Sequence, residues 1–426
     1  MARKKSDSSS TSRRSSSRSG QSAAIGVFIV VVIIVVGLIF GQDTAATLGQ
    51  IVGINVSGTT EEAAAPTEAT SPKTQPAQAG QPTSETAATP QLPTTGGSGG
   101  SSSGPFWTVY FTEPDLYENS TTSGGIELHL IDLINNAQSS IDLAVFEFNL
   151  QGVADALIAA HNRGVTVRIV HDDEHTADDP QMDQMIKAGI AAMPDKRSAF
   201  MHNKFFIIDR QLVWTGSWNV TTNDTFQNNN NAIVLRSQQI VENYQTEFNE
   251  MFEGSFGTTS PANTPNPEIT INGIKVENYF ASEDEVMPAL IRFTSTAQKS
   301  IHFMAFSFTD YDLAKAMMDR GAAGAELIGI IERLGADTDA AECGTLRKAG
   351  FDARIDGNPR TFHHKVIIVD GIAVALGSFN WSNNAANNND ENLVIIYDPA
   401  LAAQYEQEFQ ARWAETTLLE GDSCKK

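Results

Sequence analysis

Cysteine is nearly absent from this chain of 426 residues, which contains only Cys343 and Cys424. Two cysteines cannot build the disulfide framework on which small secreted domains depend. The sequence therefore predicts two unpaired thiols without a role, and a fold that is stabilised by its hydrophobic core. Apolar residues make up 41% of the chain, which is sufficient for packed cores in two or three domains of ordinary size.

Basic residues are also scarce. The chain has 29 Lys and Arg against 51 Asp and Glu, which gives a net charge of -22. Six of the basic residues and only one acid lie in residues 1–20, so the rest carries 23 basic against 50 acidic residues, near -27. Because nucleic-acid binding draws its affinity from Lys and Arg, this balance disfavours a nucleic-acid partner without excluding one.

One long uncharged run, SAAIGVFIVVVIIVVGLIFG, occupies residues 22–41. A helix needs roughly 20 apolar residues to cross a bilayer, whereas the core of a signal peptide has about 7 to 15. The run therefore predicts one uncleaved transmembrane helix, with a cleaved signal peptide as the alternative. Because basic flanks stay cytoplasmic, residues 1–21 are expected in the cytoplasm, and the catalytic part on the outer side of the cell membrane.

Composition divides the remainder of the chain. Residues 42–105 are rich in Ala, Thr, Ser, Pro and Gly, which predicts a flexible linker, because such a segment buries too little apolar surface to order itself. Beyond it the chain is an internal repeat. The predicted parts are a first copy at 106–258, a proline-containing linker between the lobes at 259–272, a second copy at 273–418 and a tail at 419–426.

The two copies keep the same register over a long distance. SSIDLAVFEF begins at Ser139 and KSIHFMAFSF begins at Lys299, which is 160 residues later, and His202 and His363 are 161 residues apart. Within each copy, β-rich runs alternate with amphipathic helical segments. This alternation predicts an α/β fold of two lobes, each with a mixed sheet that is flanked by helices.

The string MHNKFFIIDRQLVWTGSWN in the first copy recurs as FHHKVIIVDGIAVALGSFN in the second. Residues i and i+2 of a strand share a face, so His202 and Lys204 point the same way, as do His363 and Lys365. A buried lysine needs a partner, and an anion such as phosphate would satisfy both side chains. An edge strand with polar residues facing water would explain one copy, but the identical spacing in two copies favours the anion site.

Other polar residues follow at matched positions in each copy. The aspartates suit turns, and the serines and asparagines offer neutral donors to turn backbone or to phosphate oxygens. These residues are Asp209, Ser217 and Asn219, and then Asp370, Ser378 and Asn380. Further along, the second copy has an acid, Glu391, where the first has Asn230.

The pattern H-x-K-x4-D followed by G-S-x-N, present twice, resembles the phospholipase D superfamily over residues 106 to about 418. The resemblance implies a two-lobed fold with one site between the lobes. One histidine attacks phosphorus to form a phosphohistidine, and the other protonates the leaving alcohol, after which water or an alcohol releases the product. No metal and no cofactor is implied. Among the matching residues, the resemblance implies that six are catalytic, namely His202, Lys204, Asp209, His363, Lys365 and Asp370. It implies that Ser217, Asn219, Ser378 and Asn380 bind phosphate, and the match also includes Gly216 and Gly377.

By this resemblance His202 is the nucleophile and His363 the general acid. Members of the superfamily usually carry an acid downstream in each copy, whereas here only the second copy does, at Glu391. In the first copy Asp224 is nearby but out of register. A carboxylate beside a histidine ring stabilises the protonated form. The sequence therefore predicts that Glu391 orients His363 and keeps it protonated, and that His202, with Asn230 in its own copy, is neutral and able to attack.

Two other features are expected to be peripheral. The string HDDEHTADD, residues 171–179, follows a strand and reads as an exposed acidic loop, with the rim of the active site as the alternative. No metal site is predicted there. His364 lies between His363 and Lys365, and its side chain should face away from theirs.

The leading interpretation is a phosphoric diester hydrolase of phospholipase D type, acting on phospholipid head groups at a membrane surface. It is expected to be a monomer, because one chain completes the site. One alternative is a nuclease of the same superfamily, which the acidic balance disfavours. Phosphatidyl transfer resembling that of cardiolipin synthase is another, for which more membrane segments are expected. A non-catalytic surface binding module is the last, and two intact His/Lys pairs argue against it.

Overall fold

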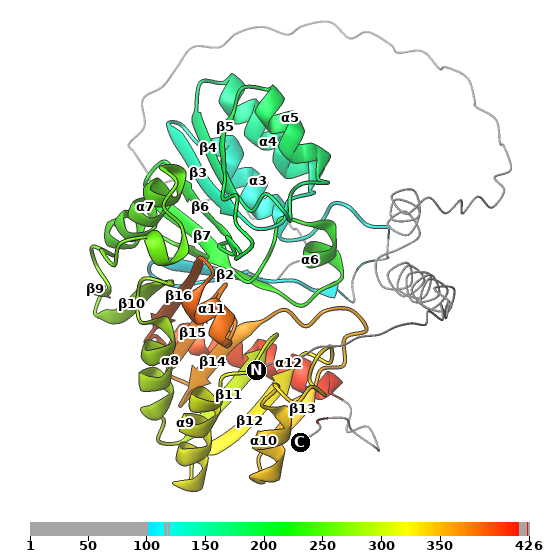
Figure 1. Ribbon diagram of the computed structural model, residues 1–426, viewed down its shortest axis with the longest axis vertical. Coiled ribbons are helices and arrows are strands. Elements are labelled where there is room, and N and C mark those ends of the chain that lie inside the picture. Colours follow the sequence, from blue (N-terminus) through cyan, green and yellow to red (C-terminus); the bar gives the residue numbers. More distant parts are fainter. Residues whose placement is uncertain (1–100, 115–116, 118–119, 417–423, 425–426) are drawn as a thin grey trace, which may run out of the picture. The chain divides into compact units, whose positions relative to one another are not determined.

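The computed structural model describes residues 101–114, 117, 120–416 and 424. These residues form two lobes, each built on one eight-stranded mixed sheet (Figure 1). The two-lobed α/β fold predicted from the internal repeat is thereby confirmed. The fold places the two sheets so that both copies of the repeated motif meet where the lobes join.

The first sheet has the strand order β1-β2-β8-β7-β6-β3-β4-β5, in which β3, β4 and β5 are parallel and all other neighbours are antiparallel. Its strands are β1 Ser101–Ser103, β2 Trp107–Phe111, β3 Ser140–Val145, β4 Thr166–His171, β5 Ala191–Pro194, β6 Phe205–Ile208, β7 Leu212–Gly216 and β8 Asn231–Leu235. Its helices are α3 Glu127–Asn136, α4 Gln151–Asn162, α5 Pro180–Lys187, α6 Thr222–Phe226 and α7 Gln238–Phe252, and a 3-10 turn, η2, spans Gly257–Thr259.

The second sheet has the order β13-β12-β11-β14-β15-β16-β10-β9, which is the order of the first sheet read from its other end with every strand number raised by eight. Its strands are β9 Glu268–Ile271, β10 Ile274–Ala281, β11 Ser300–Ala305, β12 Glu326–Ile331, β13 Asp352–Ile355, β14 Lys365–Val369, β15 Ala373–Gly377 and β16 Glu391–Ile396. Its helices are α8 Val286–Ser295, α9 Tyr311–Ala322, α10 Cys343–Lys348, α11 Asn383–Asn387 and α12 Pro399–Glu415.

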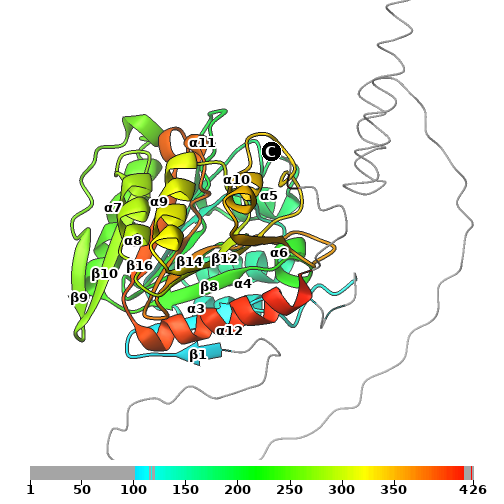
Figure 2. The same cartoon turned by 90° about the horizontal axis from the view of Figure 1, so that it is seen from below.

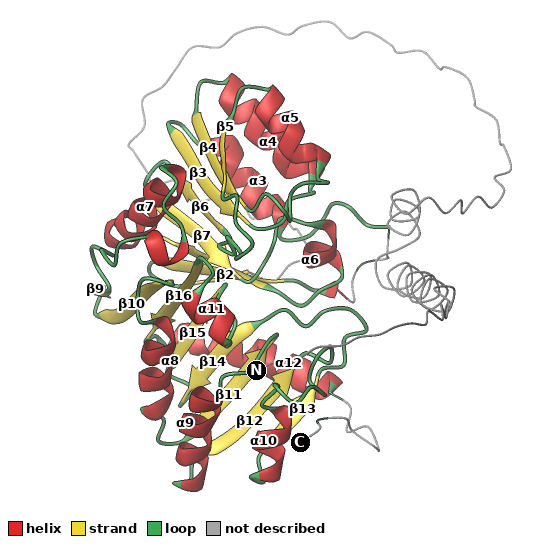
Figure 3. Ribbon diagram, in the orientation of Figure 1, coloured by secondary structure: helices red, strands yellow, loops and turns green. Residues whose placement is uncertain are grey.

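Each sheet is covered on both faces, which explains why its central strands are apolar without alternation. On β6, Phe206 and Ile208 pack into the core of the first lobe, while Phe205 and Ile207 belong to a cluster that both lobes share. Helices α3, α4 and α5 cover the outer face of the first sheet, and α8, α9 and α10 cover that of the second (Figure 3). A continuous apolar run is the expected pattern for a strand that is buried on both faces.

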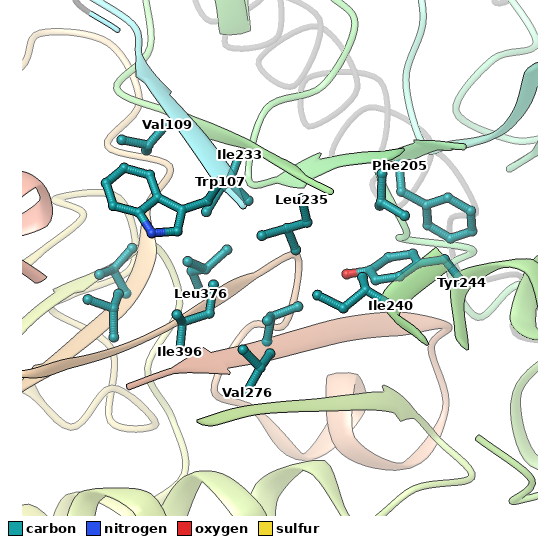
Figure 4. Packing of buried hydrophobic residues seen from close by; sticks show 14 of the residues in the cluster. Trp107, Val109, Phe205, Ile233, Leu235, Ile240, Tyr244, Val276, Leu376 and Ile396 are labelled. Atoms are coloured by element: carbon teal, nitrogen blue, oxygen red, sulfur yellow. The ribbon is translucent and has the colours of Figure 1, made fainter. Parts of the chain in front are cut away.

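The inner faces of the two sheets and the closing helices α7 and α12 form one apolar cluster across the seam. Leu235 and Tyr244 of the first lobe lie in it with Val276, Leu376 and Ile396 of the second (Figure 4). Helix α12, which follows the second sheet in the chain, packs on β15 and also on β2, and it runs beside β1 of the first lobe (Figure 2). The lobes therefore share one core, and their relative placement is set by side-chain packing.

The structure corrects two expectations about the ends of the lobes. Ser101–Ser103, within the predicted flexible linker, forms β1 and pairs with β2, because the backbone of an edge strand can supply the hydrogen bonds whatever its side chains. Glu268–Ile271, within the predicted linker between the lobes, forms β9 on the edge of the second sheet.

The prediction of two unpaired thiols is wrong, because Cys343 and Cys424 form a disulfide across a sequence separation of 81 residues. Cys343 is the first residue of α10, and its side chain is fully buried. The disulfide attaches a residue near the C-terminus to the second lobe. Spacing along the chain cannot show such a pairing, because it depends on where the fold brings the two side chains.

The predicted localisation, a single-pass membrane protein with an outer catalytic part, is also corrected. Within residues 101–114, 117, 120–416 and 424 no helix is long and apolar enough to cross a membrane. Residues 22–41, on which that prediction depended, lie outside the described residues.

A buried hydrogen bond across the seam yields the first testable prediction. The indole Nε1 of Trp107 on β2 donates to Oδ2 of Asp398 at 2.7 Å, and Oδ1 of Asp398 caps α12 by accepting from the backbone of Ala400. Asp398→Ala removes a helix cap, worth about 1 kcal/mol. It also leaves a buried donor unpaired, at roughly 1–3 kcal/mol. We expect the free energy of unfolding in urea to fall by about 2–4 kcal/mol.

The matched control is Asp310→Ala. Asp310 caps α9 through the backbone of Leu313 without a buried indole partner, so only the capping loss of about 1 kcal/mol is expected. Equal losses in the two variants would show that the Trp107 hydrogen bond does not stabilise the seam.

Candidate active site

The two histidines of the repeated motif lie at the seam, each held by backbone from the opposite lobe. The amide of His202, three residues before β6, donates to the carbonyl oxygen of Asp390 at 2.9 Å. The amide of His363 donates to the carbonyl oxygen of Asn229, also at 2.9 Å. Each contact belongs to a short parallel bridge in which the segment before a histidine pairs with the segment that leads into β16 or β8. The site therefore forms only where the two copies meet.

The side chains that orient the histidine rings also cross between the lobes. Nδ1 of His202 lies 2.7 Å from Oε2 of Glu391, and Nδ1 of His363 lies 2.9 Å from Oδ1 of Asn230. The prediction that Glu391 orients His363 is therefore wrong, because Glu391 belongs to His202. The repeat shows which residues correspond in the two copies, but only the packing of one lobe on the other decides which histidine each residue meets.

Two buried serines hold the orienting side chains in place. Ser378 Oγ donates to Oε2 of Glu391 at 2.7 Å, and Ser217 Oγ donates to Oδ1 of Asn230 at 2.9 Å. A hydroxyl has one hydrogen to donate. Because both hydrogens are committed inside the protein, the predicted contact of Ser217 and Ser378 with phosphate is replaced by a contact with the orienting residues.

The glycines before these serines allow the close approach of two strands. Gly216 has φ of 143° and Gly377 has φ of 150°, a region that residues with a Cβ rarely adopt. A Cβ on Gly216 would overlap the carbonyl oxygen of Asn231, and one on Gly377 would overlap that of Asn392. The motif needs glycine at these positions so that the neighbouring strand, which follows or carries the orienting residue, can pack closely against the backbone.

The two lysines stand beside the histidines in matching ways. Nζ of Lys204 donates to the carbonyl oxygen of His202, and Nζ of Lys365 donates to that of His363, both at 2.8 Å. Both lysines are almost fully buried. The ammonium groups also lie 4.8 Å from the ring centre of Phe146 and 4.6 Å from that of Phe306.

Burial lowers the pKa values of all four groups, and repulsion by neighbouring positive charges adds to this effect for His202, His363 and Lys365. Burial, with the charges of Lys204 and Lys365, holds the pKa of His202 well below its usual value, and the same three causes act on His363. Burial lowers the pKa of Lys204 to about 8 against the opposing charge of Glu391. The pKa of Lys365 is also well below its usual value, through burial and the charge of Lys204. Since the charge of each lysine lowers the pKa of both histidines, the charged groups of the two copies form a single coupled site.

Glu391 shares this environment. Burial raises its pKa to about 7, while the positive charge of Lys204 and the hydrogen bonds from Ser378 and Asn389 oppose the rise. A buried carboxyl group with a histidine at hydrogen-bond distance can exchange a proton with that ring as charge develops on it.

The structure places Asp209 and Asp370 away from the histidines, at the hairpin turns that end β6 and β14. Both have positive φ, 53° and 55°, as a tight hairpin turn requires. The carboxylate of Asp209 accepts backbone hydrogen bonds from Gln138, Ser139 and Ser140, and Asp370 does the same with residues 298–300. Burial would raise the pKa of each carboxyl group, but these hydrogen bonds outweigh it and lower the pKa. The predicted catalytic role of Asp209 and Asp370 does not fit this position, which indicates instead that the two aspartates fix the turns.

The asparagines of the G-S-x-N motifs remain candidates for contact with a ligand. Asn219 is almost fully buried and Asn380 is half-buried, and the side-chain oxygens of both lack a hydrogen-bond partner within the described part of the chain. Asn219 also lies with Lys204 in the lining of one small cavity. An amide oxygen accepts hydrogen bonds and the amide nitrogen donates them, so the side-chain NH2 groups of these asparagines are the atoms that could bind a phosphate.

Several residues near the histidines were not singled out from the sequence as part of the site. Phe146 packs edge-on to His202 and Phe306 to His363, with ring centres 4.6 and 4.8 Å apart. The repeat could have marked these two phenylalanines, since Phe146 directly follows β3 and Phe306 directly follows the corresponding strand, β11. Glu147 follows Phe146, and Asp224 Oδ2 lies 3.6 Å from Nδ1 of His363. Neither acid has an acidic counterpart in the second copy, so the repeat could not mark them.

The acidic segment at residues 171–179 is at the rim of the site and is only partly exposed. Asp172 is 1% exposed and accepts a hydrogen bond from the backbone of Met201 at 3.2 Å. The ring of His175 packs on Phe146 with centres 4.1 Å apart. The alternative of a cleft rim therefore describes this segment better than an exposed loop. His364 points away from the two lysines, as expected, and meets Asn231 at 3.0 Å.

Comparison with known proteins agrees with this geometry. A family model described as "Cardiolipin synthase, PLD-like domain" matches residues 130–252 and 290–413, which together are more than half of the chain. The chain therefore belongs to the phospholipase D superfamily.

Individual relatives match parts of the chain. A mitochondrial cardiolipin hydrolase from Xenopus tropicalis is 36% identical over 125 residues, which cover 29% of this chain and 60% of that protein, less than two thirds of its length. A phospholipase D from Rickettsia bellii (strain RML369-C) is 30% identical over 159 residues, 36% of this chain and 79% of that protein. The crystal structure of a phosphatidylserine synthase from Haemophilus influenzae Rd KW20 has a TM-score of 0.55 at 15% identity, covers 69% of this chain and 85% of its own, and shows the fold alone.

The charge of the site yields a prediction about anion binding. Sulfate keeps its charge between pH 6.5 and 9.5, whereas Lys204, with a pKa of about 8, loses its proton over that range. An ammonium attracts an anion only below its pKa, so affinity should fall as pH rises. We expect the Kd of sulfate, measured by calorimetry, to rise by at least ~10-fold between pH 6.5 and pH 9.5.

Two variants serve as references for this experiment. Lys204→Met should bind sulfate weakly at pH 6.5 and show a shallower dependence on pH. Lys187→Met changes an exposed lysine that pairs with Asp183, and should behave like the unaltered protein. An affinity that is constant over the range would mean that sulfate does not bind between these lysines.

Proposed function

We propose that this protein hydrolyses phosphodiester bonds through a covalent phosphohistidine on His202, with His363 as general acid. The observation that carries the proposal is the convergence of two His/Lys pairs on one buried site, with Nδ1 of each ring already bound by a residue of the opposite copy. With Nδ1 occupied, Nε2 of each ring is the nitrogen left for chemistry. Two such nitrogens suit attack on phosphorus and protonation of a leaving group.

The first step uses the lowered pKa of His202. Because burial and two ammonium groups disfavour its protonation, the ring is neutral and can attack. The bond from Nε2 to phosphorus forms as the bond from phosphorus to the leaving oxygen breaks, and positive charge develops on the ring. Glu391, 2.7 Å from Nδ1, stabilises that charge and fixes the tautomer in which Nε2 carries the lone pair.

The second histidine supplies the proton that the leaving oxygen needs. Bound substrate brings negative charge between Lys204 and Lys365, which offsets the repulsion that lowers the pKa of His363. His363 then donates from Nε2 to the leaving oxygen. In the second step it takes a proton from water as that water attacks the phosphohistidine, which releases the product and restores His202. The lysines and the Asn219 and Asn380 amides stabilise the phosphoryl oxygens throughout.

We further propose that the substrate is a phospholipid, cleaved at the head-group phosphodiester at a membrane surface. The names of the related cardiolipin hydrolase and phospholipase D support this class, and the excess of acidic residues disfavours nucleic acid. One chain contributes both histidines and both orienting residues, which supports a monomeric enzyme.

The roles of the histidines can be separated with an aryl phosphodiester whose nitrophenol leaves without a proton. His202→Ala should form no phosphoenzyme and lose at least ~10⁴-fold in nitrophenol release. His363→Ala should still release nitrophenol in a burst and accumulate phosphoenzyme, but lose ~10²–10⁴-fold on an alkyl diester, which needs the acid. The measurement is rapid-quench kinetics with a radiolabelled substrate. The reverse pattern would assign attack to His363.

The substrate class is tested with a panel in the presence and absence of EDTA. The panel contains phosphatidylcholine, phosphatidylethanolamine, cardiolipin and single-stranded DNA. We expect head-group release from at least one lipid, undiminished by EDTA, because the motif itself supplies nucleophile, acid and cations. His202→Ala/His363→Ala is the blank. Cleavage of DNA alone would favour the nuclease alternative, and activity that EDTA abolishes and a divalent ion restores would contradict the proposed mechanism.

A further inference from the structure

The two copies differ in where they carry the acid that faces a histidine. In the register that aligns His202 with His363, Asn230 of the first copy corresponds to Glu391, and Asp224 corresponds to Ala385. The second copy thus has its acid at the start of β16 and a small residue on α11. The first copy has an amide just before β8 and an acid on α6. The strand position thus carries the acid in the second copy only, and the helix position carries it in the first copy only.

The carboxylate on α6 lies near the ring that would otherwise have none. Oδ2 of Asp224 is 3.6 Å from Nδ1 of His363, and the Asp224 side chain is only 5% exposed. Asn230 supplies the shorter contact to Nδ1, at 2.9 Å. Asn230 also binds the backbone of Asp224, since its Nδ2 donates to that carbonyl oxygen at 3.1 Å. The two residues therefore approach the same ring nitrogen, Nδ1 of His363, and are bound to each other.

Several hydrogen bonds hold the backbone and the side chain of Asp224 in position. Its amide donates to Oγ1 of Thr221, the cap of α6, at 3.1 Å. Its carboxylate accepts from the amide of Asn219 at 3.0 Å and from Nδ2 of Asn228 at 2.6 Å. These contacts aim the carboxylate at the seam. They also allow a purely structural role, in which Asp224 shapes the turn that carries Asn219, and the experiment has to distinguish the two roles.

An amide and a carboxylate do different work beside a histidine. The oxygen of Asn230 can accept the hydrogen on Nδ1 and so fix the tautomer, but a neutral amide supplies little energy to hold a proton on Nε2. Lys365, Lys204, His202 and His364 all disfavour that proton by their positive charge. A buried negative charge close to Nδ1 opposes them directly, because charges that are shielded from water interact strongly.

We propose that Asp224 is the positioning residue that replaces the missing strand carboxylate of the first copy, so that Asn230 orients His363 and Asp224 supplies the charge that keeps it protonated as general acid. The proposal rests on the proposed function. In the step concerned, the proton passes from Nε2 of His363 to the leaving oxygen as the bond from phosphorus breaks, and the bonding electrons stay on that oxygen. The proton does not pass through Asp224 in this step.

The test compares kcat of the full-length enzyme on two diesters that differ only in the leaving group, nitrophenol or a simple alcohol. Asp224→Asn should lower kcat on the alkyl diester by ~10²–10³-fold and on the nitrophenyl diester by less than ~10-fold, because only the alcohol needs the acid. Asp224 also favours the charged form of both lysines, and that effect is common to the two substrates and cancels in their ratio.

Rescue distinguishes charge from structure. Asp224→Asn/Asn230→Glu places the acid where the second copy has it, and should restore the ratio of the two kcat values to within ~10-fold of the unaltered enzyme. Asp142→Asn, which removes a buried carboxylate that pairs with Arg168, is the control and should leave the ratio unchanged. If Asp224→Asn does not fold, Asp224→Ser answers the same question, since its hydroxyl can still accept from Asn219.

Each outcome decides the proposal. Equal losses on both substrates, or no recovery in the double variant, would make Asp224 a structural residue only. A selective loss with recovery supports the relocated acid. Failure of the proposed function would look different, because the unaltered enzyme would then form no phosphoenzyme with the nitrophenyl diester.

Discussion

The site depends on one interaction, the contact of each histidine with the strand segment of the opposite copy. The backbone of His202 is bound to Asp390, and its ring is bound to the next residue, Glu391. The same pair of contacts, to Asn229 and Asn230, holds His363. Since neither histidine is oriented within its own lobe, the apolar cluster at the seam is a condition for the site to exist, and its packing sets the geometry of the ring nitrogens.

A second constraint is the burial of like charges. Two lysines and two histidines are gathered with little exposure. Burial lowers the pKa of each, and the charges of the two lysines lower the pKa values of both histidines further. Such an arrangement costs free energy in the absence of an anion, and a phosphate group would relieve it. The stability of the rest of the lobes holds these groups together, so an energetic preference for an anion is present before any ligand binds.

Duplication gave the site its two halves, and the halves have since diverged. The residues that form the hairpin turn and allow the close approach of two strands are the same in both copies. Asp209, Gly216 and Ser217 correspond to Asp370, Gly377 and Ser378. The residues that set charge around each ring differ, with Glu391 facing His202 and an Asn230–Asp224 unit facing His363. Identical rings given different surroundings can take different roles, and a nucleophile and an acid require that difference.

Much of this protein follows from the sequence by itself. The repeat determined the two lobes and their mixed sheets, because alternating β-rich and helical runs admit few other layered folds. The spacing of His202 and Lys204, repeated at His363 and Lys365, determined the residues of the site, since a strand puts them on one face.

The tertiary structure alone decided the partners. It paired Glu391 with His202 and bound the carboxylates of Asp209 and Asp370 to backbone amides at the start of β3 and β11. It also assigned the hydroxyls of Ser217 and Ser378 to the orienting residues and joined Cys343 to Cys424. The physical reason is that periodicity reports which face a side chain takes within its own element, whereas contacts between elements depend on how those elements pack together. The contact of Glu391 with His202, 189 positions apart, depends further on how one lobe packs against the other.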